Sequence, residues 1–456
     1  MISSWRRKRT SRGAAGGEGG NGGKRKPTEL IVPNHFRCPI SLDMMKDPVT
    51  LSTGISYDRE SIEKWIEAGN ITCPMTNQVL RTLEPIPNHT IRRMIQDWCV
   101  ENRSQGVERI PTPRIPISSD EVGFILDRIS MARTPQEGRD LVRKLSKALK
   151  ESDRNKRCIV GNGASVKVLS LAFQSFANSE GETVISLLED IMSVLTSLTP
   201  LLDSHSQTEG EIVISLKAPR SLERLVWFLK GGSGLSGIRN SVMILKELVS
   251  TRTDHSKVVE SLATMEGAME GLVKLVKDPI CPASTKASLV VIYHMIISTH
   301  NFSSKNIIIE RFIDMGLVSL VLDTLVDAEK SVCEKALGVL DGLIRTDKGR
   351  EAAYGQALAI PVVVKKILRV SDLATEFSVS ILCRLCENEK REDGGVIVEA
   401  LQVGAFQKLL LILQVGWNVN DRVKEKVTKM LKLLNLFRSK VECIESMDFK
   451  DLKRPF

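Results

Sequence analysis

The chain has 456 residues, of which 42% are hydrophobic and only 4% aromatic. That length allows more than one domain or a long repeat array, and a core built mainly from Leu, Ile and Val suits packed helices better than a β-sandwich or barrel. Residues 1–27 contain eight Lys or Arg and one Glu, so they carry +7 of the net charge of +9 and leave +2 for the rest. A remainder so close to neutral argues against nucleic-acid binding by the globular part.

The nine cysteines have no framework spacing, which favours a reducing, intracellular location over a disulfide scaffold. No run of about 18 apolar residues is present, and the basic N-terminus is not followed by an apolar segment. We therefore expect neither a membrane span nor a signal peptide, and we expect a cytoplasmic protein.

Residues 1–29 are of low complexity, with seven glycines between Gly13 and Gly23, and are expected to be disordered. Two basic clusters flank the glycines, at residues 6–9 and 24–26. They leave three interpretations open: a solvated tail, a nuclear import signal that would add a nuclear location, or peripheral contact with an anionic membrane.

Two short motifs, Cys38-Pro39-Ile40-Ser41 and Cys73-Pro74-Met75-Thr76, are laid out like half-sites of a zinc-binding RING module. In each of them a hydroxyl residue stands where the second cysteine would be. A closed zinc site needs four Cys or His ligands, and a two-metal RING needs about eight. Between residues 33 and 106 the candidates are only His35, Cys38, Cys73, His89 and Cys99. We therefore expect no metal, and stabilisation by hydrogen bonds, salt bridges and a small apolar core.

Two helices are predicted in this region. Asp58 is suited to N-cap the first, Ile62, Trp65 and Ile66 share one face of it, and Gly69 suits its end.

The second helix is expected to begin after Asn88 and to carry an apolar stripe that runs from Ile91 to Cys99. Short strands are expected near residues 49–51 and 56–57. The prolines between Ile110 and Pro116 resist helix and predict a domain boundary.

From Ser119 onward the sequence is helical almost throughout and repeats itself. The repeated pattern is a small residue, an apolar residue, three variable residues and another apolar residue. It starts near Gly163, Lys217, Gly267, Met315, Ala357 and Gly404. These starts are separated by 54, 50, 48, 42 and 47 residues, close to the roughly 40 to 47 of armadillo or HEAT units. The pattern predicts an α-solenoid with a long groove.

Other motifs are assigned to the core. Cys383 and Cys386 form a CxxC on one face of a predicted helix and have no second pair nearby, so we interpret them as packed core residues. Cys38 and Cys73 lack a recognisable His and acidic partner, so no catalytic nucleophile is expected.

The segment 36–102 also contains Asp47-Pro48-Val49, Thr53-Gly54, Tyr57-Asp58-Arg59 and Ile86-Pro87-Asn88. With the two cysteine motifs, it resembles the U-box of plant ubiquitin ligases. The resemblance implies a surface for a ubiquitin-conjugating enzyme, with Trp65 open between interface and core. The implied contact residues are Ile40, Leu42, Trp65 and Pro74.

The resemblance also implies structural roles for Cys38, Asp58 and Asn88. Asn77 stands where many such domains place a cation that clamps the closed, ubiquitin-loaded conjugating enzyme. Self-association through the U-box is left open.

We therefore predict a mostly α protein in which a small, zinc-free, RING-like α+β domain is followed by an α-solenoid of armadillo-like repeats. The expected organisation is a disordered tail at 1–29, a U-box at 33–107, a linker at 108–118, repeats at 119–440 and a C-terminal tail at 441–456.

The arrangement is similar to plant U-box/armadillo ligases implicated in defence and stress signalling. The family implies partners in ubiquitin, a conjugating enzyme and a protein substrate held in the repeat groove, with no cofactor and no covalent thioester on the ligase. The Gly267 and Gly404 segments resemble the opening of the third armadillo helix.

Basic residues on those helices suggest an acidic partner: Lys274, Lys365, Lys366 and Lys408. The alternative function is a non-catalytic armadillo scaffold. A nuclear import adaptor is less favoured, because Trp227 and Trp417 do not form a ladder.

Overall fold

The computed structural model describes residues 32–110, 117–199, 215–251, 255–298, 302–389, 395–414 and 421–438. Contacts divide the chain into two compact units, Met1–Ile115 and Pro116–Phe456, and each has its own hydrophobic core. The tails predicted at residues 1–29 and 441–456 and most of the predicted linker lie outside the described residues.

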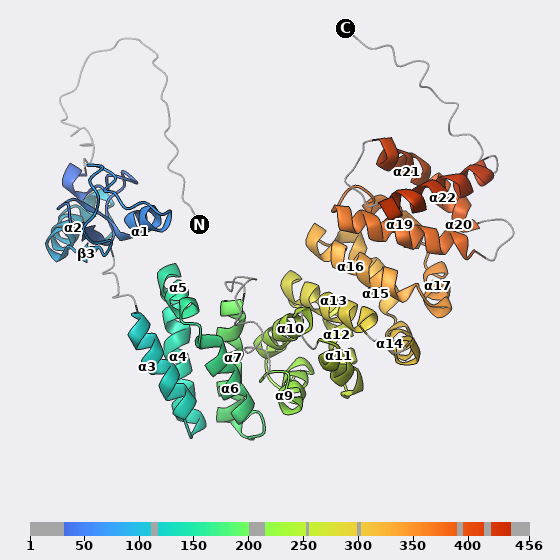
Figure 1. Cartoon of the computed structure of the whole chain (residues 1–456), viewed down its shortest axis with the longest axis horizontal. Helices are drawn as coiled ribbons and strands as arrows, with labels where there is room; N and C mark the ends of the chain where they lie inside the picture. Colours follow the sequence, from blue (N-terminus) through green and yellow to red (C-terminus); the bar gives the residue numbers. More distant parts are fainter. Residues whose placement is uncertain are drawn as a thin grey trace, which may run out of the picture. The chain divides into compact units, whose positions relative to one another are not determined.

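The predicted fold class is confirmed. Most of the described chain is helical, and the strands of the described residues all belong to the first unit (Figure 1).

The first unit combines a three-stranded antiparallel sheet, in the order β2-β1-β3, with two α-helices. In the sheet Pro48 lies opposite Asp58, and Thr50 lies opposite both Ser56 and Ile86. The elements of this unit are η1 (Asn34–Phe36), β1 (Pro48–Thr50), β2 (Ser56–Asp58), α1 (Arg59–Glu67), β3 (Ile86–Pro87), α2 (His89–Glu101) and η2 (Arg103–Gln105).

Local signals explain both helices, and their predicted positions are confirmed. Asn88 Oδ1 accepts a hydrogen bond from Ile91 N at 2.9 Å, which caps the start of α2. The chain leaves α1 at Gly69, whose φ of 88° is costly for residues with a Cβ. The two helices bury Ile62 and Ile95 in the core of the unit.

One detail of α1 differs from the prediction. Asp58 precedes the helix, but its side chain makes no capping hydrogen bond. Instead Asp58 Oδ1 accepts hydrogen bonds from Lys46 N and Asp47 N, both at 2.8 Å. A tertiary partner thus replaces the local one that the sequence suggested.

The second unit is built from helices only, within the described residues. They are α3 (Ser119–Met131), α4 (Pro135–Glu151), α5 (Asp153–Gly161), α6 (Ser165–Phe176), α7 (Glu182–Leu198), α9 (Pro219–Leu229), α10 (Leu235–Ser250), α11 (His255–Thr264), α12 (Ala268–Lys277), α13 (Pro282–Ile297), α14 (Phe302–Asp314), α15 (Leu317–Asp327), α16 (Lys330–Leu343), α17 (Asp347–Tyr354), α18 (Ala359–Lys366), α19 (Asp372–Glu387), α20 (Gly395–Gln402), α21 (Ala405–Gln414) and α22 (Asp421–Phe437).

Beginning with α4, each third helix along the chain packs against the helix three places later, and these contacts form a continuous ladder. The ladder helices are α4, α7, α10, α13, α16, α19 and α22. Figure 1 shows α10, α13 and α16 on the inner side of the curved second unit, with α9, α11 and α14 on its outer side. The inner surface of the array is therefore formed by these ladder helices.

The repeat starts found in the sequence do precede helices, but these helices are not the ones that form the ladder. Each start lies one or two residues before a helix, namely α6, α9, α12, α15, α18 and α21. The expectation that the Gly267 and Gly404 segments open third armadillo helices is wrong, because α12 and α21 lie outside the ladder. Each of the six helices is followed by a longer helix, and these longer helices form the ladder. The sequence analysis chose the wrong helices because period and apolar spacing reveal a helix but not the helices that it contacts.

Cys383 and Cys386 lie on α19 and are 5% and 3% exposed, so their interpretation as core residues is confirmed. Burial raises the pKa of the Cys383 thiol to about 11 and that of the Cys386 thiol further.

A charged network joins the last three ladder helices. Asp341 on α16, which is 4% exposed, accepts from Arg345 at 3.3 Å and from Arg384 on α19 at 3.0 Å. Ser380 Oγ then accepts from Arg384 and from Lys426 of α22, both at 3.2 Å. The buried carboxylate is thus compensated by guanidinium groups.

Among the described helices, none is by itself both long and apolar enough to cross a membrane. Within the part of the chain that the structure describes, the pair α20 and α21 taken together would pass on length and composition, and the two helices are bent by 66°.

Lys408, one of the lysines expected to face a partner, is used inside the array. Its Nζ on α21 donates to the carbonyls of Val364, Lys365 and Ile367 at 2.6, 3.1 and 3.4 Å. These carbonyls lie at the C-terminal end of α18, where the last C=O groups have no partner four residues on within the helix, although Val364 O also accepts from Ile367 N at 3.3 Å. Lys408 therefore caps a neighbouring helix.

We expect Lys408→Ala to lower the free energy of unfolding of the array by about 1–2 kcal/mol, because it removes a charged donor from the end of α18. Lys365→Ala is the matched control, since that side chain is exposed and the carbonyl of residue 365 is retained. Thermal unfolding followed by circular dichroism measures both variants. Equal melting temperatures for the two variants would contradict the capping role.

Candidate functional site

Loop 1, residues 38–43, is closed by two backbone hydrogen bonds around Cys38. Cys38 N donates to Asp43 O, and Leu42 N donates to Cys38 O, both at 2.8 Å. Leu42 adopts a left-handed φ of 61°. Arg37 and Met44 pair as an isolated antiparallel bridge on either side of the loop.

Loop 2, residues 73–78, repeats this geometry position by position. Cys73 N donates to Gln78 O at 2.9 Å, and Asn77 N donates to Cys73 O at 2.8 Å. Asn77 has a φ of 56°, and Thr72 and Val79 form the flanking bridge. Leu42 and Asn77 therefore occupy equivalent positions in two equivalent turns.

A hydroxyl residue supports the thiol in each loop. The side chain of Ser41 hydrogen-bonds Cys38, and that of Thr76 hydrogen-bonds Cys73. These hydroxyl residues stand where the second cysteine of a zinc half-site would be. The described residues contain no group of three or more His, Cys, Asp or Glu side chains arranged to hold a metal ion.

Strand β2 supports both loops from inside the unit. The backbone of Asp58 hydrogen-bonds the Cys38 thiol. The hydroxyl of the adjacent Tyr57, which is 0% exposed, lies 3.0 Å from Cys73 Sγ and accepts from Met75 N at 3.3 Å. Two consecutive residues thus connect the two loops to one strand.

The hydrogen bonds around Cys73 set its ionisation. Burial opposes a charged thiolate, but hydrogen bonds from Thr53, Thr76 and Tyr57 outweigh burial and lower the pKa of Cys73 to about 6. Burial and the neighbouring Cys73 raise the pKa of Tyr57 above its ordinary value. Tyr57 therefore stays protonated and can donate to the sulfur.

The loops present apolar side chains to solvent. Ile40 is 38% exposed, Leu42 is 68% exposed and Met75 is 60% exposed, while Pro74 is half-buried. The sequence analysis did not identify Met75, although in the repeated pattern Cys-Pro-apolar-hydroxyl it takes the same position in the second motif as Ile40 takes in the first. Exposed apolar residues on rigid loops mark a surface for a protein partner.

Trp65, left open between interface and core, is half-buried against the core of the unit. Its Nε1 donates to Thr72 O at 2.8 Å, directly before loop 2. The indole therefore holds loop 2 against α1, and this contact positions the loop whether or not a partner also touches the ring.

Asn88 ties three elements together. In addition to capping α2, its Nδ2 donates to Thr50 Oγ1 at 3.0 Å on β1 and to Ser56 Oγ at 3.3 Å on β2. Its backbone N donates to Pro48 O at 2.9 Å.

Asp47 links the two helices of the unit. Its carboxylate accepts from Arg59 Nε of α1 at 2.7 Å and from Arg92 of α2. The three side chains are 12–16% exposed. Such partly buried, charge-assisted pairs are stronger than surface pairs.

Comparison with known proteins places both units in one family. The U-box domain family matches residues 32–104, and the plant U-box protein ARM repeat region matches residues 121–454. U-box domain-containing protein 21 of Arabidopsis thaliana is 42% identical over 434 residues, which are 94% of each chain. The Arabidopsis thaliana E3 ubiquitin-protein ligase PUB23 is 32% identical over 414 residues, covering 89% of this chain and 93% of the relative.

A chain from the solved structure described as "A conserved phosphorylation switch controls the interaction between cadherin and beta-catenin in vitro and in vivo" resembles this fold with a TM-score of 0.50. The similarity covers 77% of this chain and 67% of the other at 13% identity, so it supports the fold alone.

We expect Tyr57→Phe to loosen loop 2 while the ring still fills the core. The variant leaves Cys73 Sγ and Met75 N with one partner fewer, which costs about 1–2 kcal/mol locally. Amide hydrogen exchange of loop 2 should therefore quicken by about tenfold. Tyr354→Phe removes the equivalent hydroxyl bond to Leu385 O in the array and should leave loop 2 unchanged. Unaltered exchange in Tyr57→Phe would contradict the role of β2.

Proposed function

The chain belongs to the plant U-box proteins that carry an armadillo-repeat region, and we propose that it is a ubiquitin-protein ligase whose first unit recruits a ubiquitin-loaded conjugating enzyme. The main support is the pair of equivalent loops that hydrogen bonds from β2 hold in place. The two loops present Ile40 and Met75 at matching positions. Leu42, Pro74 and Trp65 would extend this surface. A cluster of apolar anchors at such a surface supplies much of the binding energy of a protein partner.

The ligase acts by positioning. Cys38 and Cys73 are both 0% exposed, which supports a mechanism without a thioester on this chain. The amine of a substrate lysine attacks the thioester carbonyl on the conjugating enzyme, an amide bond replaces the carbon–sulfur bond, and the thiol of that enzyme leaves. Holding both reactants close raises their effective concentration, and a correct orientation lowers the barrier further.

Asn77 is proposed to stabilise the closed form of the loaded conjugating enzyme. Its side chain is exposed at the end of loop 2, and the left-handed turn fixes the direction of its backbone. An amide has hydrogen-bond donors but no charge, so this clamp would be weaker than the cation found at the same position in related domains.

The array is proposed to bind the substrate, because stacked helices offer a long surface that can vary without disturbing the core. A role in defence or stress signalling is proposed from family analogy alone. A cytoplasmic location is proposed from the cysteine pattern, and the basic tail would allow nuclear import or contact with a membrane as alternatives. The alternative is a scaffold that binds partners and catalyses nothing.

We expect Ile40→Ala and Met75→Ala each to weaken binding of the conjugating enzyme by about 2 kcal/mol, roughly thirtyfold, and to reduce autoubiquitination in proportion. Val100→Ala, an aliphatic truncation on α2 at a side chain 58% exposed, is the matched control. Titration calorimetry with a panel of conjugating enzymes measures the effect. Full activity of both loop variants with every enzyme of the panel would rule out this surface.

The separate cores allow ligase and scaffold to be distinguished. A fragment of residues 30–110 should transfer ubiquitin without a substrate, whereas residues 118–456 should catalyse nothing, because each unit has its own core. Circular dichroism verifies that both fragments fold. A folded but inactive first fragment would favour the scaffold.

A further inference from the structure

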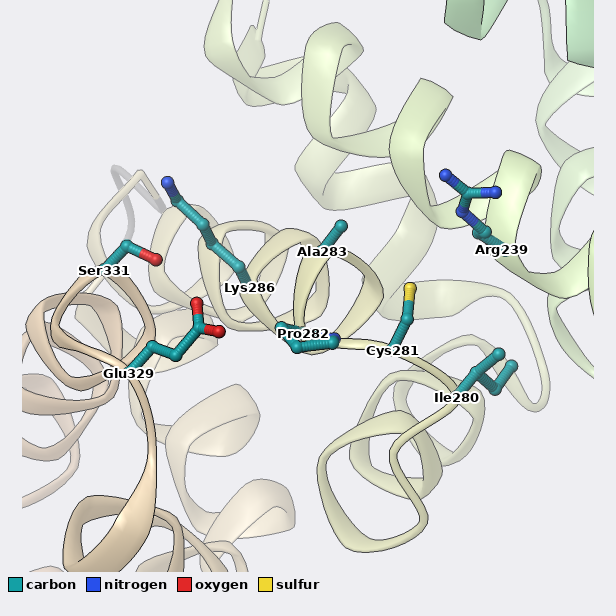
Figure 2. Close-up of a pocket in the computed structure, with 8 residues that line it drawn as sticks. All are labelled: Arg239, Ile280, Cys281, Pro282, Ala283, Lys286, Glu329 and Ser331. Carbon is teal, nitrogen blue, oxygen red and sulfur yellow. The ribbon is translucent and has the colours of Figure 1, made fainter. Parts of the chain in front are cut away.

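A cavity of about 740 Å³ lies in the second unit (Figure 2). Its polar lining consists of Arg239, Cys281, Lys286, Glu329 and Ser331. Arg239, Glu329 and Ser331 are exposed, so the cavity opens to solvent.

The lining comes from three consecutive ladder helices. Arg239 lies in the first turns of α10, Cys281 is the N-cap of α13, and Glu329 is the N-cap of α16. The ladder helices form the inner surface of the array, so a segment that lies along that surface can reach the cavity.

Two cations line this cavity. Within the described residues, neither Arg239 nor Lys286 has a carboxylate within the 4.0 Å of an ion pair. Figure 2 shows their side chains on neighbouring helices, with Cys281 and Ala283 between them along the wall. The charge of Lys286 helps to lower the pKa of Glu334, but neither cation forms an ion pair among the described residues. Cations that line a concave surface without an ion-pair partner attract an anion.

The thiol of Cys281 reports the same positive potential. Burial opposes its ionisation, but hydrogen bonds with Ser284 and the charge of Arg239 outweigh burial and lower the pKa of Cys281. The start of α13 adds the partial positive charge of a helix N-terminus.

We propose that this cavity binds an acidic side chain of a protein segment lying along the inner surface of the array, with its carboxylate or phosphate attracted by the charges of Arg239 and Lys286. The proposal rests on the assignment of the array as the substrate-binding part. It differs from the basic surface suggested by the sequence, because Lys274, Lys365 and Lys408 lie on α12, α18 and α21, outside the ladder.

The cavity suits a peptide better than a nucleic acid or a free ion. Its volume of about 740 Å³ exceeds that of one acidic side chain and leaves room for neighbouring residues of a segment. A nucleic acid would require a row of cations, and Glu329 places a carboxylate in the wall instead. We expect Glu329 to favour a basic or neutral residue beside the acidic one.

Cys281 allows occupancy to be measured directly. The full chain is treated with iodoacetamide at low salt, alone or with a Gly-Ser peptide that carries phosphoserine, glutamate or serine at its centre. Mass spectrometry follows alkylation of Cys281, and Cys158 on α5, also half-buried, is the internal reference. The phosphoserine or glutamate peptide should slow alkylation of Cys281, while the serine peptide and the reference should show no change.

Charge reversal tests which groups hold the anion. Arg239→Glu and Lys286→Glu should each reduce protection by about fivefold, expressed as the ratio of rates with and without peptide in the same variant. Lys274→Glu on α12 is the matched control and should keep the protection. Circular dichroism verifies folding.

Failure of both anionic peptides to protect Cys281, or protection that persists in both reversal variants, would overturn the proposal. Autoubiquitination measured on the same preparations reports the first unit separately. Lost ligase activity with intact protection would therefore count against the proposed function and not against this site.

Discussion

The candidate site depends on the hydrogen bonds that β2 makes to two thiols. Tyr57 holds loop 2 through Cys73 and Met75, and the backbone of Asp58 holds loop 1 through Cys38. In a zinc module the metal would carry out this cross-linking, and its ligands would be charged thiolates. Here a phenol, a backbone N–H and two hydroxyl residues share the task, so the loops are rigid only while the strand beneath them is in place.

The rest of the first unit protects that strand. Asn88 connects β1, β2 and the start of α2, and Asp47 joins Arg59 of α1 to Arg92 of α2. Each group is only partly buried, which limits the cost of desolvating the charges. The small core around Tyr57 therefore relies on polar contacts more than a larger domain would, as expected where little apolar surface can be buried.

In the array, the environment of a cation determines what it can do. Lys408 donates its hydrogen bonds to the carbonyls at the end of α18, and Arg384 donates to the buried Asp341. Arg239 and Lys286 form no ion pair within the described residues and line an open cavity. The same residue types thus stabilise the stack in one layer and offer charge to a partner in another, and only their contacts separate the two roles.

Local patterns determined much of this protein. The paired Cys-Pro motifs, the cap at Asn88 and the repeat starts such as Gly267 were readable from the sequence, because turns, caps and helical periods depend on residues close along the chain. Only the tertiary structure decided that Tyr57 supports loop 2 and that the helices after the repeat starts form the ladder. Those outcomes depend on which side chains far apart in the sequence come into contact. Such a hydrogen bond, or the packing of one helix against another, produces no periodic pattern in the sequence.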